Sequence, residues 1–255
     1  MTVGLDWLPQ TAFLYMLIFA RVGSMLMLMP ALGETTIPAR MRLSFALLFA
    51  LVLFPLLSAN LPAMPAEIND MLALLFHELA VGLILGAIAR IITMATQTAG
   101  AIIAFQSGLS TAMAADPSQG GIQGAVIGSF LSFLGLALIF ATDLHHVALA
   151  AIYDSYTVFP PTAPLMFDDA AQLAIRAVTG AFNVGVQMSA PFIVFGLIFN
   201  LGMGILSKLM PQLQVFFIAM PANVMLGMAL IAVLLTAMMG LYISHYEAEL
   251  ALLRG

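Results

Sequence analysis

The 255-residue chain is 63% hydrophobic and 7% charged, with a formal net charge of -5. Soluble domains average about 45–50% apolar and about 25% charged residues, so the composition excludes an ordinary soluble protein. The seven basic residues are scattered, which excludes a nucleic-acid-binding surface, and the absence of cysteine excludes disulfides and thiolate metal sites.

Long apolar stretches, separated by polar or Pro/Gly breaks, predict an all-α polytopic membrane protein with about six transmembrane helices. The stretches lack the alternation of a membrane barrel, and each can cross a bilayer as a helix. The N-terminus has no features of a cleaved signal peptide, so we expect the first span to be retained. The expected spans are residues 9–30, 41–60, 71–92, 121–142, 172–200 and 216–244, with a more polar, broken or re-entrant element at 93–120.

Ionisable residues interrupt the first and third expected spans. Arg21 lies deep in the first span, so we expect it to face protein or water, or its helix to lie outside lipid. The sequence HELAV begins like a zinc-protease helix, but Val81 stands where the second histidine is required. We therefore expect His77 and Glu78 to lie at the outer end of their span and to reach water.

Small residues recur four positions apart in two spans. This spacing allows helix backbones to approach closely, within one chain or against another subunit. The positions are Gly82, Gly86, Gly120, Gly124, Gly128 and Ser132.

The segment 106–121 has the glycine- and serine-rich composition of an exposed loop. Such backbone is tolerated at membrane depth only where protein or water surrounds it. An ordinary connecting loop and a gate or constriction loop fit this composition equally well. The candidate residues are Gln106, Gly108, Ser110, Met113, Asp116, Pro117, Gly120 and Gly121.

The densest ionisable cluster is Asp143, His145 and His146. These side chains are able to bind a metal or relay a proton. No further ligand is obviously placed to complete a metal shell, so we favour a hydrogen-bonded cap where a helix leaves the membrane. The chain has no nucleophile elbow and no P-loop, and we predict no enzymatic activity, metal or cofactor.

The stretch SKLMPQLQVFFIAMP at 207–221 interrupts an almost uncharged region. Pro211 breaks the helical hydrogen-bond pattern, and Lys208, Gln212 and Gln214 supply polar groups that require water or a partner. The pattern predicts that residues 201–215 form the bend of a long helical hairpin.

Four segments in order resemble the FliR family, the R subunits of the type III protein export gate in flagella and virulence secretion. The most specific combinations are D-x-H-H followed by S-Y and P, and K-x-x-P-Q-x-x-V-F followed by P. The segments are RVGSMLMLMPALGETTIPARMRLSFAL (21–47), QSGLSTAMAADP (106–117), DLHHVALAAIYDSYTVFP (143–160) and SAPFIVFGLIFNLGMGILSKLMPQLQVFFIAMP (189–221).

The resemblance implies a subunit that assembles with P and Q subunits (FliP and FliQ) and contacts the B subunit (FlhB). Together they would form the conduit for unfolded proteins across the bacterial inner membrane at the flagellar basal body. Many nominal spans would then be lifted out of the bilayer, which would account for Arg21. The resemblance further implies a P-like part at 1–170 and a Q-like hairpin at 171–255.

Two site predictions also follow from the resemblance. Residues 106–121 correspond to the loop that plugs the channel, with Met113 helping to seal it, and the hairpin tip corresponds to a subunit contact through Lys208, Pro211, Gln212 and Gln214. The alternative is a self-contained ion-coupled transporter, whose coupling path would use Arg21, Arg90 and the Asp143, His145 and His146 cluster.

Overall fold

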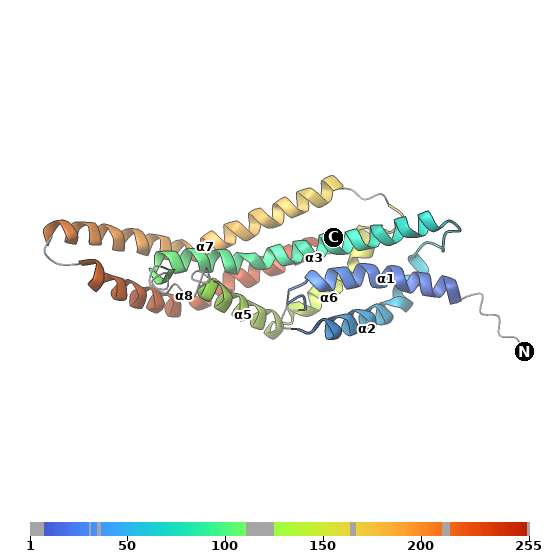
Figure 1. The fold of residues 1–255 in the computed structure, drawn as a ribbon, viewed down its shortest axis with the longest axis horizontal. Coiled ribbons are helices and arrows are strands. Elements are labelled where there is room, and N and C mark those ends of the chain that lie inside the picture. The colour runs from blue at the N-terminus through green and yellow to red at the C-terminus, as the bar shows by residue number, and fades with distance from the viewer. Residues whose placement is uncertain are drawn as a thin grey trace, which may run out of the picture. The chain divides into compact units, whose positions relative to one another are not determined.

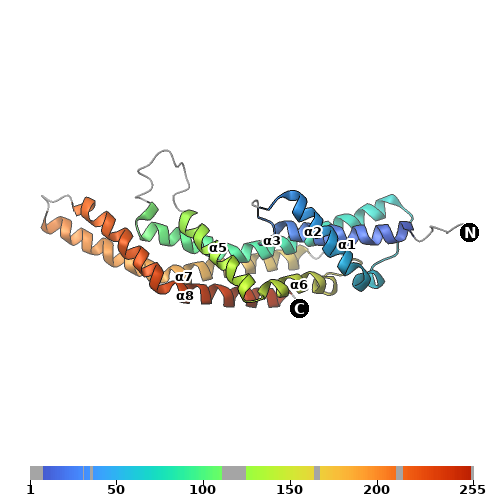
Figure 2. The same ribbon diagram turned by 90° about the horizontal axis from the view of Figure 1, so that it is seen from below.

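The computed structural model describes residues 8–30, 32–34, 37–110, 125–163, 167–210 and 215–253. Within these ranges the chain is helical and contains no strand, which confirms the all-α prediction (Figures 1 and 2). The elements are α1 (Leu8–Leu28), α2 (Ala39–Leu57), the 3-10 turn η1 (Ser58–Asn60), α3 (Ile68–Gln106), α5 (Ala125–Ala141), α6 (Leu144–Val158), α7 (Phe167–Leu209) and α8 (Val215–Leu253).

Five helices of the described residues are long and apolar enough to cross a membrane, or six if α5 and α6 form one broken span. This agrees with the predicted number. Helices suit such sequences because every backbone N–H and C=O is paired within the segment, where lipid offers no partner.

The prediction of a separate, broken element at 93–120 is wrong for its first half, because α3 continues to Gln106. Thr96 shows how a polar side chain is accommodated there. The buried Thr96 hydroxyl bonds to the Thr93 carbonyl at 2.9 Å and to the Ser132 hydroxyl at 2.8 Å. Hydroxyls that bond to carbonyls one turn earlier leave a helix intact, which explains why the polar composition did not end it.

The last two helices are much longer than the spans predicted at 172–200 and 216–244. Helix α7 has 43 residues and α8 has 39. At 1.5 Å per residue α7 is about 65 Å long, whereas the hydrocarbon core of a bilayer is about 30 Å thick. Residues 201–209 are helical, so the predicted bend is wrong for this part, and residues 211–214 lie outside the described part of the chain.

Charges at the two ends of α7 complement its helix dipole. Asp168 and Asp169 lie in its first turn and Lys208 lies in its last turn. Acidic groups at the N-terminus and basic groups at the C-terminus of a helix each stabilise it by about 0.3–1 kcal/mol.

The chain forms two compact units. The first contains 1–91, 143–177 and 248–255, and the second contains 92–142 and 178–247. In the first unit Phe13, Leu14 and Leu17 of α1 form a buried cluster against α2 and the start of α3. The predicted P-like part (1–170) and Q-like hairpin (171–255) were defined by family resemblance, and the two compact units do not test them. That division stays a prediction.

Glycine contacts confirm close helix packing within the chain. In the second unit, a Cβ atom on Gly100 of α3 would overlap the backbone of Gly128 in α5, so the two helices touch there without side chains between them. In the first unit, a Cβ on Gly86 would lie 2.8 Å from the Met25 carbonyl oxygen of α1. Gly120 and Gly124 lie outside the described residues.

Replacing Gly100 by alanine is expected to lower the free energy of unfolding by about 1–3 kcal/mol, because the added methyl group overpacks the α3–α5 contact. Gly240→Ala is the matched control, since nothing lies within 4 Å of a Cβ at that helical position. Thermal unfolding in detergent, followed by circular dichroism, measures both. Equal effects of the two substitutions would contradict the contact.

Candidate functional site

A buried ion pair joins α1 to α3 in the first unit. Arg21 and Glu78 are both 0% exposed. The Arg21 Nε donates to Glu78 Oε2 at 2.8 Å, and Nη2 donates to Glu78 Oε1 at 2.7 Å. This two-bond arrangement is the geometry that a planar guanidinium and a carboxylate prefer, and it removes the cost of an unpaired buried charge.

The remaining Arg21 contacts go to the end of α6. Nη1 donates to the Ser155 carbonyl at 3.0 Å, and Nη2 donates to the Phe159 carbonyl at 2.8 Å. The Ser155 carbonyl also accepts the backbone N–H of Phe159 at 2.9 Å, and carbonyls at the C-terminus of a helix carry partial negative charge that attracts a cation. The guanidinium carbon also lies 4.0 Å from the centre of the Tyr156 ring. Arg21 therefore caps α6 while it pairs with α3.

Two small residues let α1 and α3 approach closely enough for this pair. A Cβ on Gly82, one turn after Glu78, would overlap the Ser24 hydroxyl and the Arg21 carbonyl. The Ser24 hydroxyl bonds to the Ala20 carbonyl at 2.7 Å, so it is satisfied inside α1. The expectation that Gly82 marks a helix contact is confirmed.

The prediction that Glu78 reaches water is wrong. Its carboxylate is buried against Arg21, and only His77 remains partly accessible, with 13% of its side chain exposed. An Arg in one apolar span and a Glu in another were a signal for pairing, because an isolated charge is costly in such helices. The expectation that Arg21 faces protein is confirmed.

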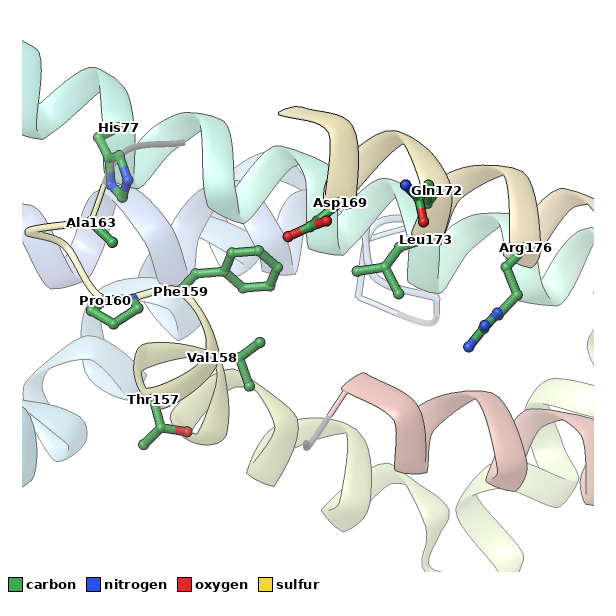
Figure 3. Close-up of a pocket in the computed structure, with 10 residues that line it drawn as sticks. All are labelled: His77, Thr157, Val158, Phe159, Pro160, Ala163, Asp169, Gln172, Leu173 and Arg176. Atoms are coloured by element: carbon green, nitrogen blue, oxygen red, sulfur yellow. The ribbon is translucent and has the colours of Figure 1, made fainter. Parts of the chain in front are cut away.

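A cavity of about 590 Å³ adjoins this cluster in the first unit (Figure 3). Figure 3 shows His77 of α3 on one side and the first turns of α7, which carry Asp169, Leu173 and Arg176, on another. Among the described lining residues no nucleophile stands beside a base. The Thr157 hydroxyl instead donates to the Asp154 carbonyl at 2.7 Å.

The Asp143, His145 and His146 cluster lies at the start of α6. Asp143 occupies the N-cap position with φ 60° and makes no side-chain capping hydrogen bond, so the predicted hydrogen-bonded cap is wrong in that respect. Ligand atoms of the three residues lie within 4.8 Å of one another, a spacing compatible with a divalent cation. Asp143 and His146 are highly exposed, which favours a solvated cluster.

The predicted loop begins where α3 ends. Gln106 is the last residue of α3, and Gly108 follows with φ +69°, a left-handed conformation that glycine adopts without steric cost. The Ser110 hydroxyl donates to the Ala104 carbonyl at 3.1 Å and satisfies one of the free carbonyls at the helix end. The helix termination is therefore encoded locally.

The family described as "Bacterial export proteins, family 1" matches residues 12–248. The chain belongs to this family. The match covers almost the whole length, and it confirms the resemblance to the FliR family that the sequence motifs indicate.

Individual relatives agree with this assignment. The flagellar biosynthetic protein FliR of Caulobacter vibrioides is 45% identical over 231 residues, which cover 91% of this chain and 92% of the relative. FliR of Bacillus subtilis is 31% identical over 225 residues, covering 86% of this chain and 85% of the relative. The Yop proteins translocation protein T of Yersinia pestis is 22% identical over 237 residues, covering 92% and 90% of the two chains.

The structure of this export-family chain places only some of the predicted site residues. Of the loop, Gln106, Gly108 and Ser110 are described, and of the hairpin tip only Lys208, which is exposed at the end of α7. The other predicted residues lie outside the described part of the chain: Met113, Asp116, Pro117, Gly120, Gly121, Pro211, Gln212 and Gln214.

Removing one partner of the Arg21–Glu78 pair is expected to destabilise the export protein strongly. Glu78→Gln leaves the buried guanidinium without a counter-charge, and such losses lower the free energy of unfolding by about 3–5 kcal/mol. Thermal unfolding in detergent and the steady-state amount in membranes measure the effect. Arg176→Gln, an exposed arginine of the same unit, is the control, and equal losses would contradict the assignment.

Proposed function

We propose that this chain is a core subunit of the flagellar or type III protein export gate and forms, with P and Q subunits, the conduit for unfolded proteins. The observation that carries the proposal is the 45% identity to a FliR over 91% of the chain. The proposed role is structural rather than enzymatic. Energy for transport would come from partners or from the proton motive force, since the sequence holds no P-loop.

The surface of α7 supports a place within a larger assembly. The helix is longer than a bilayer is thick, so part of it requires water or protein as its surroundings. Yet this long helix exposes large apolar side chains as far as its last residue. Outside lipid, such an apolar surface is best covered by protein partners. Examples are Leu197, Ile198, Leu201, Ile205 and Leu209, each at least 60% exposed.

The proposed partners are FliP, FliQ and FlhB in the bacterial inner membrane at the flagellar basal body. Residues 1–170 would take the position of a P-like subunit, and 171–255, which include α7 and α8, that of a Q-like hairpin. Two long consecutive helices fit the hairpin part. Segment 106–121 would plug the channel, and the α7–α8 connection with Lys208 would contact FlhB.

Assembly tests the proposal directly. Co-expression with P and Q subunits from the same genome, followed by native mass spectrometry in mild detergent, should give a discrete complex with several P and Q copies. The long apolar helices gain their missing contacts only in that complex. A stable monomer or homodimer that ignores P and Q would refute the gate subunit, and transport assays on the chain alone would then test an ion-coupled transporter.

The hairpin-tip contact has its own test. Lys208→Glu should reduce site-specific crosslinking to FlhB and slow export, because reversal of an interfacial charge weakens association. Arg176→Glu makes the same charge change near the other end of α7 and should leave the crosslink intact. If Lys208→Glu leaves both crosslinking and export at the normal level, the tip is not the contact.

A further inference from the structure

The end of α3 is in close contact with α7 and α8 in the second unit. Ser107 is 2% exposed, and a Cβ on Gly227 of α8 would overlap its side chain. In the same way, a Cβ on Gly196 of α7 would overlap the side-chain amide of Gln106. Both long helices therefore present glycine at the points where they meet the helix end, and the absence of a Cβ allows a close approach.

A side chain of α8 also bonds to the helix end. The Asn223 Nδ2 donates to the Gln106 carbonyl at 3.5 Å. Gln106 is the last residue of α3, so its carbonyl has no partner within the helix. The bond is long and hence weak, and the buried glycine contacts contribute more to the attachment.

Gly108, two residues after the end of α3, lies beside the same asparagine. A Cβ on Gly108 would lie 2.8 Å from Asn223 Nδ2, and the φ of +69° at Gly108 disfavours any other residue. Asn223 thus touches both the last carbonyl of α3 and the glycine at which the chain leaves the helix. Its position constrains the direction of departure.

We propose that Asn223 and Gly227 are positioning residues that anchor the base of segment 106–121 to α8. The inference rests on the proposed function, in which that segment plugs the channel. Because Ser107 is buried and packs directly against Gly227, the anchor is a fixed one.

Substitutions on the two sides of the contact test the anchor. Gly227→Ala should increase the uptake of a small fluorescent solute by cells that hold the assembled complex, because the methyl group displaces Ser107. Adding Ser107→Gly to that variant removes the opposing Cβ and should restore low uptake. Loss of the weak bond in Asn223→Ala should raise uptake by about two- to fivefold.

A matched control separates these effects from general damage. Gly240→Ala on the same helix as Gly227 adds a methyl group to open space. It should leave uptake unchanged. Native mass spectrometry of each variant with P and Q subunits confirms that the complex is present before uptake is compared. Normal uptake by an assembled Gly227→Ala complex would overturn the anchor.

A crosslink tests whether the anchor is fixed. The chain has no cysteine, so Ser107→Cys with Gly227→Cys introduces the sole pair, at a contact close enough for a disulfide after a small shift. Oxidation should form the bond and leave export no lower than in the reduced form of the same double variant. Failure to form it, or a loss of export that a reductant reverses, would overturn the proposal.

Deletion of residues 111–121 distinguishes this proposal from the function on which it rests. If the deletion increases uptake and the anchor variants do not, the segment plugs the channel but Asn223 and Gly227 do not anchor it. If the deletion leaves uptake low in an assembled complex, the segment does not plug the channel, and the proposed anchor is wrong as well.

Discussion

The pairing of Arg21 with Glu78 is the interaction on which the first unit depends. A guanidinium that is fully buried among apolar helices is tolerable only if its charge and its donors are satisfied together. Glu78 supplies the charge, and the carbonyls of Ser155 and Phe159 supply the remaining acceptors. One side chain thus fixes α1, α3 and α6, and the small residues Gly82 and Ser24 are required because they permit that approach.

The second unit is held by a different kind of contact. Its helices meet at glycines, such as Gly100 against Gly128 in α5 and Gly227 against Ser107 at the end of α3. These contacts depend on shape and not on charge, and they suit surroundings in which the hydrophobic effect gives helices little reason to associate. The outer surfaces of α7 and α8 remain rich in exposed apolar side chains, as expected of a subunit that requires lipid or protein partners.

Composition and hydropathy were sufficient to predict the helical class and the approximate span number. They failed at helix ends. A window of about 20 residues places a break inside α3 and ends α7 too early. A polar residue need not end a helix, because a hydroxyl such as that of Thr96 bonds to a carbonyl of the preceding turn. The burial of Glu78 was not predicted, because the HELAV motif was compared only with a metal site. The partner of Glu78 is Arg21, which lies 57 residues earlier in the sequence. Asn223 gave a weak signal, since one amide in an apolar helix does not reveal which carbonyl it meets. The family motifs, by contrast, carried the functional prediction.

The partners of Arg21 have a consequence for biosynthesis. The arginine precedes the Ser155 and Phe159 carbonyls by 134 and 138 residues. At roughly 5–20 residues per second, the ribosome needs between about 7 and 28 s to add that length of chain. During this interval α1 carries a charge whose acceptors are incomplete, so lipid is an unfavourable place for it. The first helix would therefore remain in contact with water or with the insertion machinery until α6 emerges, and the first unit would complete its assembly late in translation.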